Sequence, residues 1–449
     1  MIASALEAAL GAEAVTRSSE ADPDERTAAH VSGRDVGRPL CWVRPIDVHG
    51  LATVVRLAGE HGVAVVPVGG ATTYWDPLRL RDAIAVDTRA MRAPFALDEV
   101  ARFVHAGAGW SIRDIDQRAR RHGLCVAARP DAGGDTPVGA LVAVGSTAGL
   151  GLGVASPIEL VSGATVVSGR GEILRLGASH ALGGAPFARH GAPEALGLVA
   201  GGEGRGAIVG EVALLLHAVP HIATVWSRGR APLAALLAVA RAALDRGRLE
   251  AYRIELVEEL EVMARTLGRG DSSEALEAAQ ELGVALASCG LGPARIEVEP
   301  EAARRGEEPA YEYHWAFPAG EHRARLHGGA LWGVEVSVSW RSVEACAARL
   351  QRLFLDLAAL PLVTRRLALY PAPHAVTVGV QVIVRRGPDV GALVAMLEAA
   401  LPDLLALGAV PYRRGHLWRA ALGRHEGLRL SDGLLRELDP QGVVRGGGA

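Results

Sequence analysis

The amino-acid sequence predicts an α+β fold arranged in two domains. The chain has 449 residues, which is long for a single hydrophobic core. In its first half, short apolar runs typical of buried strands alternate with stretches of helical period. The second half follows the order strand, helix, strand, helix. That second pattern is typical of an antiparallel sheet that carries helices on one face.

The regular pattern of the first half begins at Arg44-Pro45, after a stretch of residues 1–40 that holds one short helix, and it ends near Pro220. Ser111 is placed to cap a helix, because its hydroxyl can accept a hydrogen bond from a backbone N–H of the first turn. The helices expected in this half are 48–61 and 111–122, and the expected strands are 63–68, 83–87, 101–106, 163–167, 171–174 and 208–216.

The second half has longer helical stretches and fewer, longer strands. Alternating apolar residues predict a strand at 376–385, and a helix is expected in the stretch that follows it. The expected helices are 232–246, 254–267, 273–286, 342–357 and 390–406, and the expected strands are 324–327, 331–340 and 376–385.

Composition narrows the class of protein. Hydrophobic residues make up 49% and charged residues 22%, and the net charge of −3 gives no electrostatic reason to expect a nucleic-acid or membrane partner. The chain contains neither Lys nor Asn, which excludes a Walker-type phosphate loop and a Schiff-base enzyme. Its four cysteines form no CxxC pair, so we expect neither structural zinc nor a disulfide framework. A reducing cytoplasm is the setting that we expect for such a chain. We expect no signal peptide and no transmembrane segment.

The stretch from Val66 to Trp75 has the character of a phosphate-binding loop. A β-branched run is followed by Gly69 and Gly70 and then by two threonines. Glycine has no Cβ to block a close approach, and consecutive backbone N–H groups can converge on phosphate oxygens. Taken alone the signal is weak, since many Gly-Gly pairs only turn a strand.

Several motifs in sequence order resemble the vanillyl-alcohol oxidase / p-cresol methylhydroxylase type of FAD enzyme, over roughly residues 40 to 445 and most weakly from 221 to 325. No single motif is specific, but the ordered set is. The motifs are Arg44-Pro45, Val66 to Trp75, Ile84 to Met91, Val104 to Gly109, Arg129 to Gly134, Val138-Gly139, Val166 to Glu172, Gly201 to Val209, Ala372-Pro373 with Val376 to Arg385, Gly408 to Arg413, and Leu438 to Gly442.

The resemblance implies a two-part FAD-binding domain and a cap domain with an antiparallel sheet covered by helices. The domains expected from it are an N-terminal extension (1–40), the FAD-binding domain (41–220), the cap (221–410) and a segment that returns to the FAD domain (411–449). Each glycine alone could equally serve a turn. The residues that would hold FAD are Gly69, Gly70, Ala71, Thr72 and Thr73 at the pyrophosphate, and Pro130, Gly133, Gly134, Gly139, Gly204, Gly206 and Val209 along the cofactor.

The same resemblance suggests a substrate site. In phenol-oxidising members, two tyrosines and an arginine hold a phenolate, and Tyr74, Tyr412 and Arg413 are the candidates here. Two hydroxyl donors and a guanidinium stabilise an anionic oxygen and lower its pKa. The alternative is that Tyr74 is a packing aromatic and Arg413 a surface charge.

This chain departs from the family at the positions where relatives attach flavin covalently. Thr377 and Val378 stand where close relatives carry a histidine, and Ala71 stands where bicovalent relatives do. We therefore expect non-covalent FAD. The stretch from Ala143 to Ser146 also lacks the carboxylate that the family's oxidases often place near flavin N5.

Other candidate residues carry weaker signals. Glu335 is either a buried carboxylate able to act as a base or a residue of a solvated strand face. His322 and His327 lack a third ligand, so we expect no metal site. The glycine repeat at 149–153 lacks the strand-to-helix context of a dinucleotide fingerprint.

These observations favour an FAD-dependent enzyme that moves a hydride from a small organic substrate, a phenol or aromatic alcohol first, to flavin N5. The alternatives are a 2-hydroxy acid or a biosynthetic intermediate as substrate, with Arg413 or Arg414 binding a carboxylate, or a flavin-fold scaffold without redox turnover. We expect a small-molecule partner and leave a homodimer open.

Overall fold

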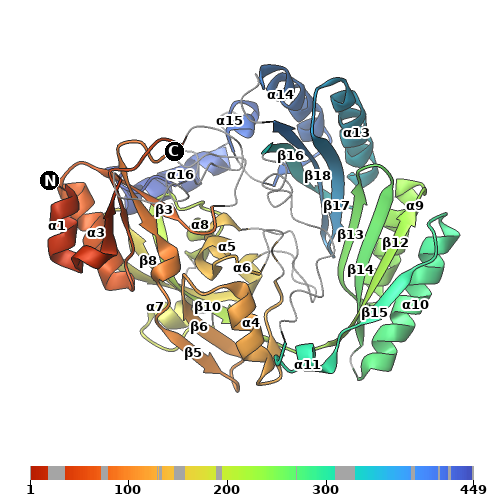
Figure 1. Ribbon diagram of the computed structural model, residues 1–449, viewed down its shortest axis with the longest axis horizontal. Coiled ribbons are helices and arrows are strands. Elements are labelled where there is room, and N and C mark those ends of the chain that lie inside the picture. The colour runs from red at the N-terminus through yellow and green to blue at the C-terminus, as the bar shows by residue number, and fades with distance from the viewer. Residues whose placement is uncertain are drawn as a thin grey trace.

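The computed structural model contains two halves, each built around its own β-structure (Figure 1). The residues that it describes are 2–18, 36–71, 79–128, 130, 134–145, 157–188, 195–268, 270–308, 329–385, 390–412, 415–422 and 426–446. The mixed α and β content, with an antiparallel sheet covered by helices in the second half, confirms the predicted fold class.

A four-stranded sheet and two helices open the chain. Their elements are α1 (Ile2–Leu10), η1 (Ala12–Ala14), β1 (Val15–Arg17), β2 (Cys41–Val43), α3 (Val48–Glu60), β3 (Ala64–Val68), β4 (Ala83–Asp87) and η2 (Thr88–Ala90). The strand order is β1-β2-β4-β3, in which β2, β4 and β3 run parallel. Asp47 caps α3 by accepting a hydrogen bond from the Gly50 N–H at 2.8 Å.

A second, antiparallel sheet follows, in the order β5-β6-β10-β8-β9. The elements of this part are β5 (Phe95–Asp98), β6 (Phe103–Gly107), α4 (Ile112–Arg120), β7 (Leu124–Cys125), α5 (Val138–Val144), α6 (Pro157–Leu160), β8 (Val161–Ser168), β9 (Ile173–Leu176), α7 (Ala178–Ala181), α8 (Leu196–Val199), β10 (Ala207–Leu215) and β11 (His217–Ala218). Leu51 and Val55 of α3 share a core with Val167 of β8 and Val65 of β3, so α3 lies between the two sheets.

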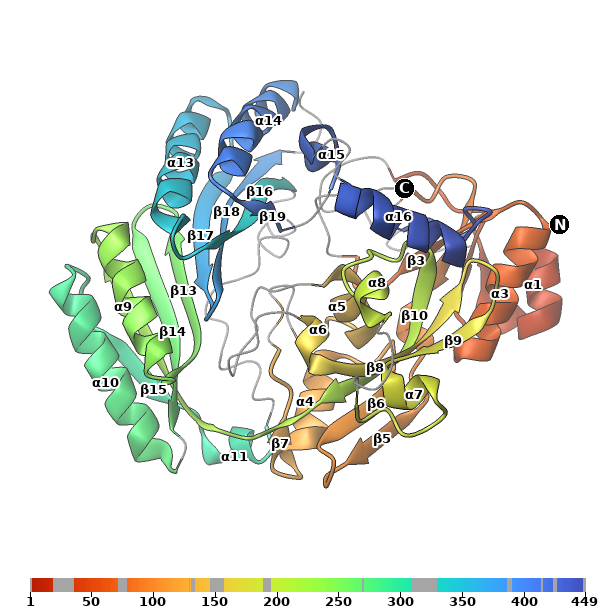
Figure 2. The ribbon, with the colours of Figure 1, turned by 180° about the vertical axis from the view of Figure 1, so that it is seen from behind.

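An eight-stranded antiparallel sheet forms the second half, in the order β15-β12-β14-β13-β17-β18-β16-β19. Figures 1 and 2 show helices on its outer face, while its other face is turned toward the first half. The elements are β12 (His221–Gly229), α9 (Leu233–Asp245), β13 (Leu249–Leu256), β14 (Leu260–Gly268), α10 (Ser272–Ser288), β15 (Arg295–Val298), α11 (Glu301–Arg304), β16 (Gly329–Ser339), α13 (Val343–Asp356), η3 (Leu357–Ala359), β17 (Thr364–Pro371), β18 (Ala375–Arg385), α14 (Gly391–Ala406) and β19 (Val410–Pro411).

The C-terminal segment runs back to the first half. It contains α15 (His416–Leu422) and α16 (Glu426–Leu438) and then pairs with the edge of β3, where Val444 lies parallel to Val65. The Val65 N–H donates to the Val443 carbonyl at 2.7 Å, and the Arg445 N–H donates to the Val65 carbonyl at 2.8 Å. The chain end thus supports the strand that leads into the Gly69-Gly70 loop.

Most of the predicted elements lie within a few residues of their observed bounds, but the helix expected at 254–267 is wrong. That stretch is the β13–β14 hairpin. Its Leu, Ala, Met and Glu content favours a helix, whereas pairing with β12 and β17 on both sides imposes a strand. The strand expected at 324–327 lies outside the described residues.

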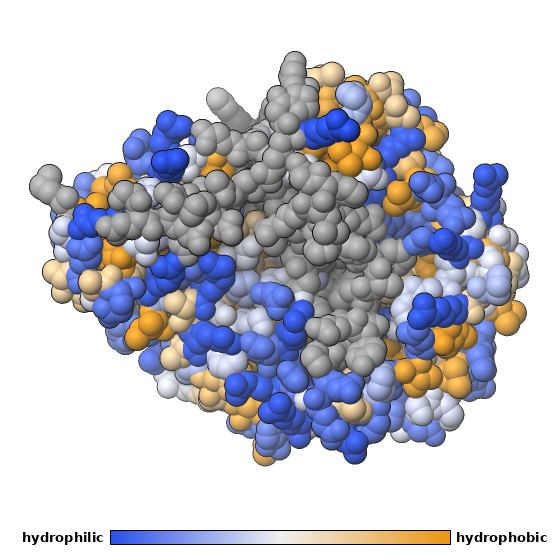
Figure 3. All heavy atoms as spheres, in the orientation of Figure 1, coloured by the Kyte–Doolittle hydropathy of each residue, from blue (hydrophilic) through white to orange (hydrophobic). Residues whose placement is uncertain are grey.

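The surface of the described part is mixed in character. Hydrophilic and apolar residues are interspersed on the visible face of both halves (Figure 3). Among the residues that the structure describes, no helix combines the length and apolar character needed to cross a membrane.

Candidate functional site

Segments that are distant in the sequence meet at the end of β3, next to the Gly69-Gly70 loop. A Cβ at Gly69 would lie 2.8 Å from the Cβ of Ala140 in α5, and a Cβ at Gly204 would lie 2.9 Å from Cγ of Pro67. Glycine at both positions therefore lets the backbone of three segments approach closely. Ligands of open α/β sheets bind outside the carboxyl ends of the strands, and β3 ends at this point.

The loop at 201–206 also closes the end of α5. The Gly201 N–H donates to the Val142 carbonyl at 3.0 Å, and the Glu203 N–H donates to the Ala143 carbonyl at 2.8 Å. Gly204 and Gly206 have φ values of 75° and 73°, a conformation that favours glycine. The loop geometry therefore depends on these two glycines.

Gly139 is required for a second close approach. A Cβ there would lie 2.6 Å from the Cβ of Ala108, at the end of β6, and the Gly139 N–H donates to the Ala108 carbonyl at 3.0 Å. Glycine at this position thus allows α5 to pack directly on the second sheet. The three predicted glycine segments form one structural unit through these contacts.

The structure describes some of the predicted cofactor and substrate residues but not all of them. Ala71 has a φ of 51°, and Val209 is 4% exposed in β10. Pro130, Gly134 and Gly139 are buried. Thr72, Thr73, Tyr74, Gly133 and Arg413 lie outside the described residues, as do the histidines at 322 and 327 and the glycine repeat at 149–153.

Asp439 holds the C-terminal segment against this unit. Its two carboxylate oxygens accept hydrogen bonds from the Val443 and Val444 N–H groups, each at 2.8 Å, and the residue is 7% exposed. Hydrogen bonds to a charged acceptor are the stronger kind, at roughly 1.5–3 kcal/mol each. Asp439 therefore fixes the strand that pairs with β3.

We expect Asp439→Ala to lower the free energy of unfolding by about 2–4 kcal/mol, because it removes both charge-assisted hydrogen bonds. We also expect the variant to retain less FAD after desalting, since the β3 edge loses its support. Denaturant unfolding and the flavin absorbance of the desalted protein measure the two effects. Glu437→Ala is the matched control, because that side chain is 82% exposed and lies 3.9 Å from Arg170 in a weak surface ion pair. Equal behaviour of the two variants would contradict the assigned role.

The face of the eight-stranded sheet opposite its described helices carries a row of charged and polar side chains. Val334 and Val336 of β16 pack in the core beneath the helices. Side chains alternate along a strand, so Glu335 points to the opposite face, which is turned toward the first half (Figure 2). The same alternation places Arg366 of β17 and Gln381 of β18 on that face.

These side chains form a continuous chain of hydrogen bonds and ion pairs that we call the polar ladder, consisting of Arg253, Glu255, Arg366, Gln381 and Glu335. Arg253 Nη2 lies 2.5 Å from Glu255 Oε2, and Arg366 Nη1 lies 3.5 Å from Glu255 Oε1. Arg366 Nε donates to Gln381 Oε1 at 2.6 Å, and Gln381 Nε2 donates to Glu335 Oε1 at 2.7 Å. All but half-buried Glu335 are at most 7% exposed.

Glu335 stands at the end of the ladder near the sheet edge. It faces Gly379 across the β16–β18 pair, and a Cβ on Gly379 would collide with its side chain. The Tyr412 N–H donates to the Glu335 backbone carbonyl at 2.9 Å, so Tyr412 lies beside Glu335. Of the two interpretations of Glu335, the structure supports a half-buried, hydrogen-bonded carboxylate rather than a fully solvated one.

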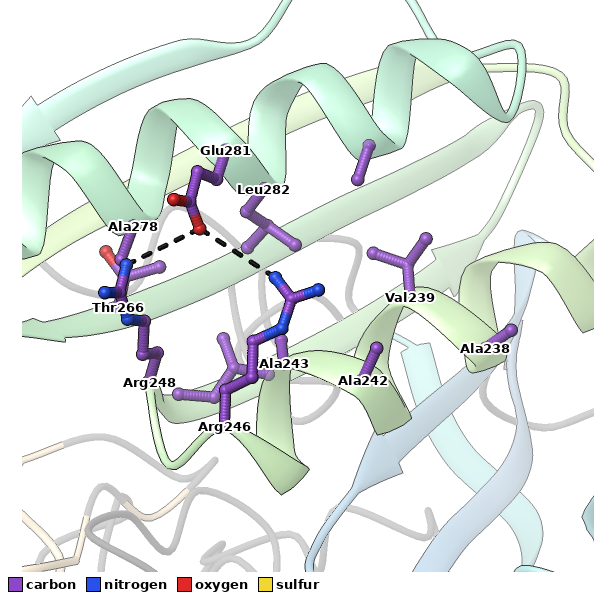
Figure 4. A pocket seen from close by; sticks show the side chains of 12 residues that line it. Ala238, Val239, Ala242, Ala243, Arg246, Arg248, Thr266, Ala278, Glu281 and Leu282 are labelled. Carbon is purple, nitrogen blue, oxygen red and sulfur yellow. Dashed lines mark hydrogen bonds and ion pairs between the residues drawn. The ribbon is translucent and has the colours of Figure 1, made fainter.

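Two pockets lie away from both the glycine unit and the polar ladder. One, of about 290 Å³, lies between α9 and α10 on the helix-covered side of the cap sheet, with Arg246, Arg248 and Glu281 at its mouth (Figure 4). The other, of about 690 Å³, is lined by Arg121, Arg304 and neighbouring residues. Neither contains a residue of the expected cofactor or substrate site.

The glycine unit fits a cofactor with a diphosphate, because it presents backbone free of Cβ atoms at the carboxyl end of a parallel strand. Residues 39–177 match the family model described as FAD binding domain. This match includes Gly69 and Gly139 but not the loop at 201–206, and it confirms that the chain contains an FAD-binding domain with FAD as its cofactor.

One curated protein shares sequence with part of this chain. It is a D-2-hydroxyglutarate dehydrogenase from Xanthomonas citri pv. viticola, 29% identical over 150 residues, which are 32% of this chain and 32% of that protein. The chain thus matches about a third of the length of that relative.

Solved structures with the same fold cover almost the whole chain. A 4-ethylphenol oxidase from Gulosibacter chungangensis has a TM-score of 0.77 at 14% identity, over 99% of this chain and 95% of its own. A p-cresol methylhydroxylase has a TM-score of 0.76 at 15% identity, with the same two coverages. An alkyldihydroxyacetonephosphate synthase reaches 0.71 at 12% identity, over 99% of this chain and 85% of its own. The chain therefore combines an FAD-binding domain with the p-cresol methylhydroxylase fold, as the resemblance predicted.

Proposed function

We propose that this protein is an FAD-dependent oxidoreductase that oxidises a 2-hydroxy acid. The observation that carries the proposal is the polar ladder. It ends in Glu335, on the face of the cap sheet that is turned toward the FAD-binding domain. FAD, when bound, accepts a hydride from the substrate carbon, and an external electron acceptor later reoxidises it.

The ladder offers the two polar functions that such a substrate needs. A hydroxyl must lose a proton as its carbon loses a hydride, and a half-buried carboxylate such as Glu335 can accept that proton. A substrate carboxylate needs a cationic partner. The guanidinium of Arg366 is separated from Glu335 in the ladder by the side chain of Gln381 alone. The dehydrogenase that shares sequence with this chain has a 2-hydroxy acid in its name.

The second candidate substrate is a para-substituted phenol. The position of Tyr412 beside Glu335 favours it, since Tyr74, Tyr412 and Arg413 are the predicted phenolate-binding residues. Two proteins of the same fold have phenolic substrates in their names. For either substrate we propose non-covalent FAD, because Thr377 and Ala71 cannot form a histidyl link.

Anaerobic mixing of the FAD-loaded protein with a panel of substrates tests the proposal. We expect 2-hydroxy acids to bleach the oxidised flavin bands and para-alkylphenols to leave them unchanged. If only phenols bleach the flavin bands, the substrate is a para-substituted phenol rather than a 2-hydroxy acid. A protein that retains no flavin after FAD addition and desalting would overturn both, and bound flavin that no substrate reduces would support a role as a scaffold.

A denaturation step tests the mode of attachment. We expect acid precipitation of the FAD-loaded protein to release all of the flavin into the supernatant, because neither predicted link position carries a histidine. Flavin that remains with the precipitated chain would contradict non-covalent binding.

A further inference from the structure

We propose a divalent metal site on the outer face of the FAD-binding domain, formed by His105, His180 and Glu211. One ligand atom of each residue lies within 4.8 Å of those of the other two. A zinc ion with bonds of about 2.0–2.1 Å separates tetrahedral ligands by roughly 3.3 Å, so small side-chain movements bring the three atoms to a metal.

Neighbouring strands fix two of the three residues. Glu211 of β10 pairs with Gly107 of β6, two residues along from His105, and His105 Nε2 lies 3.0 Å from Glu211 Oε2. His180 comes from α7, which follows the β8–β9 hairpin and packs on β8 and β9. Two antiparallel strands and a short helix thus present their ligands to one point.

Thr165 of β8 completes the polar cluster. Its hydroxyl donates to Glu211 Oε2 at 2.7 Å and lies 3.0 Å from His180 Nε2. A hydroxyl that hydrogen-bonds a ligating carboxylate is a typical outer-shell partner, which orients the ligand without binding the metal. His180 also makes a backbone hydrogen bond at Gly184, and this bond orients its ring.

The surroundings of His180 and Glu211 shift the pKa values of both groups downward. Burial, aided by the charges of His105 and Arg175, lowers the pKa of His180, so its imidazole is neutral at pH 7. Burial acts to raise the pKa of Glu211, but hydrogen bonds from His105 and Thr165 outweigh it and hold that pKa below its usual value. A donor set of two imidazoles and one carboxylate suits Zn²⁺ rather than Mg²⁺ or Ca²⁺.

The site is accessible and separate from the cofactor. The side chains of His105 and Glu211 are 19% and 16% exposed, so an ion can enter. Val104 and Ala106 pack with α4 and α5 residues, so His105 between them points to the opposite face. Figures 1 and 2 show α7 on the outer side of the first half, away from the eight-stranded sheet.

Equilibrium dialysis of the FAD-loaded protein against Zn²⁺, with elemental analysis, tests the site. We expect one zinc per chain, removable by a chelator, with affinity falling at acid pH because protons compete with the metal for the imidazoles. We expect His180→Gln and Glu211→Gln to weaken binding by at least about 100-fold, beyond the roughly 10–100-fold effect of losing an outer-shell partner.

Two further variants serve as controls. His122→Gln removes an exposed histidine that pairs with Glu99 at the surface, and it should bind zinc as the wild type does. Thr165→Val removes the bridging hydroxyl but no ligand, and it should retain zinc with an affinity reduced by no more than about 100-fold. Circular dichroism and the FAD content establish that each variant is folded. Wild-type protein that retains no zinc would overturn the proposal, as would His180→Gln protein that binds it with wild-type affinity.

Discussion

Glu335→Gln is expected to reduce the rate of flavin reduction by about 10²–10⁴-fold, the usual contribution of a general base. Glutamine has the shape of glutamate and can still hydrogen-bond Gln381, so the polar ladder should persist. It cannot accept the proton of a substrate hydroxyl. Rapid mixing of the FAD-loaded variant with substrate under anaerobic conditions measures the effect directly, and the FAD content should stay at the wild-type level.

A pH profile distinguishes a base from a structural residue. The wild-type rate should fall toward acid pH as Glu335 becomes protonated, whereas the variant should lose this acid limb. Glu261→Gln is the control, because Glu261 occupies the same face of the sheet on β14 and is 35% exposed. A slow Glu335→Gln protein with the wild-type acid limb would show that the carboxylate does not act as the base.

The second large effect concerns stability, through the buried ion pairs of Arg120. This arginine of α4 lies 2.8 Å from Asp116 Oδ2 and 3.1 Å from Glu299 Oε1, and the three side chains are at most 3% exposed. Glu299 follows β15 of the cap sheet and donates its N–H to the Ile222 carbonyl. The guanidinium thus joins the two halves of the molecule.

We expect Arg120→Ala to lower the free energy of unfolding by about 3–5 kcal/mol, because two carboxylates remain buried without their cation. Chemical denaturation measures the loss, and Arg121→Ala, one residue along and exposed, is the control.

The loss should also depend on pH in a defined direction. Without the guanidinium, burial raises the pKa of both carboxyls in the folded variant above the unfolded value, so the folded state binds more protons. The difference from wild type should therefore shrink as the pH falls from about 8 to about 5. A deficit that stays constant over this range would indicate lost packing rather than buried charge.

The local pattern of apolar and polar residues was sufficient to predict most helices and strands of the fold. Ser111 caps α4 as expected, with its hydroxyl accepting the Asp114 N–H at 3.0 Å, because capping depends on neighbours within one turn. The β13–β14 hairpin could not be found in this way, because its strand character comes from partners distant in the sequence. The strands β12 and β17, of nine and eight residues, also lacked a clear local signal, and both form between distant partners.

Some residues of the candidate site could be predicted from the sequence, and others are brought together only by the fold. The glycines at 69, 139 and 204 could be selected because a known family orders them, and their mutual contacts appear only in three dimensions. The polar ladder links Arg253 of β13 to Glu335 of β16 through two intervening strands, so no sequence spacing reveals it. Charged and apolar residues alternate in parts of β13 and β14, but this stretch is also rich in residues that favour a helix.

The most direct test of the account is anaerobic reduction of the bound FAD by a 2-hydroxy acid that carries deuterium at the hydroxyl-bearing carbon. The flavin bands are expected to bleach within one turnover, and deuterium is expected to slow this bleaching, because the bond to that hydrogen breaks as the hydride leaves. Bound flavin that stays oxidised with every 2-hydroxy acid would contradict it.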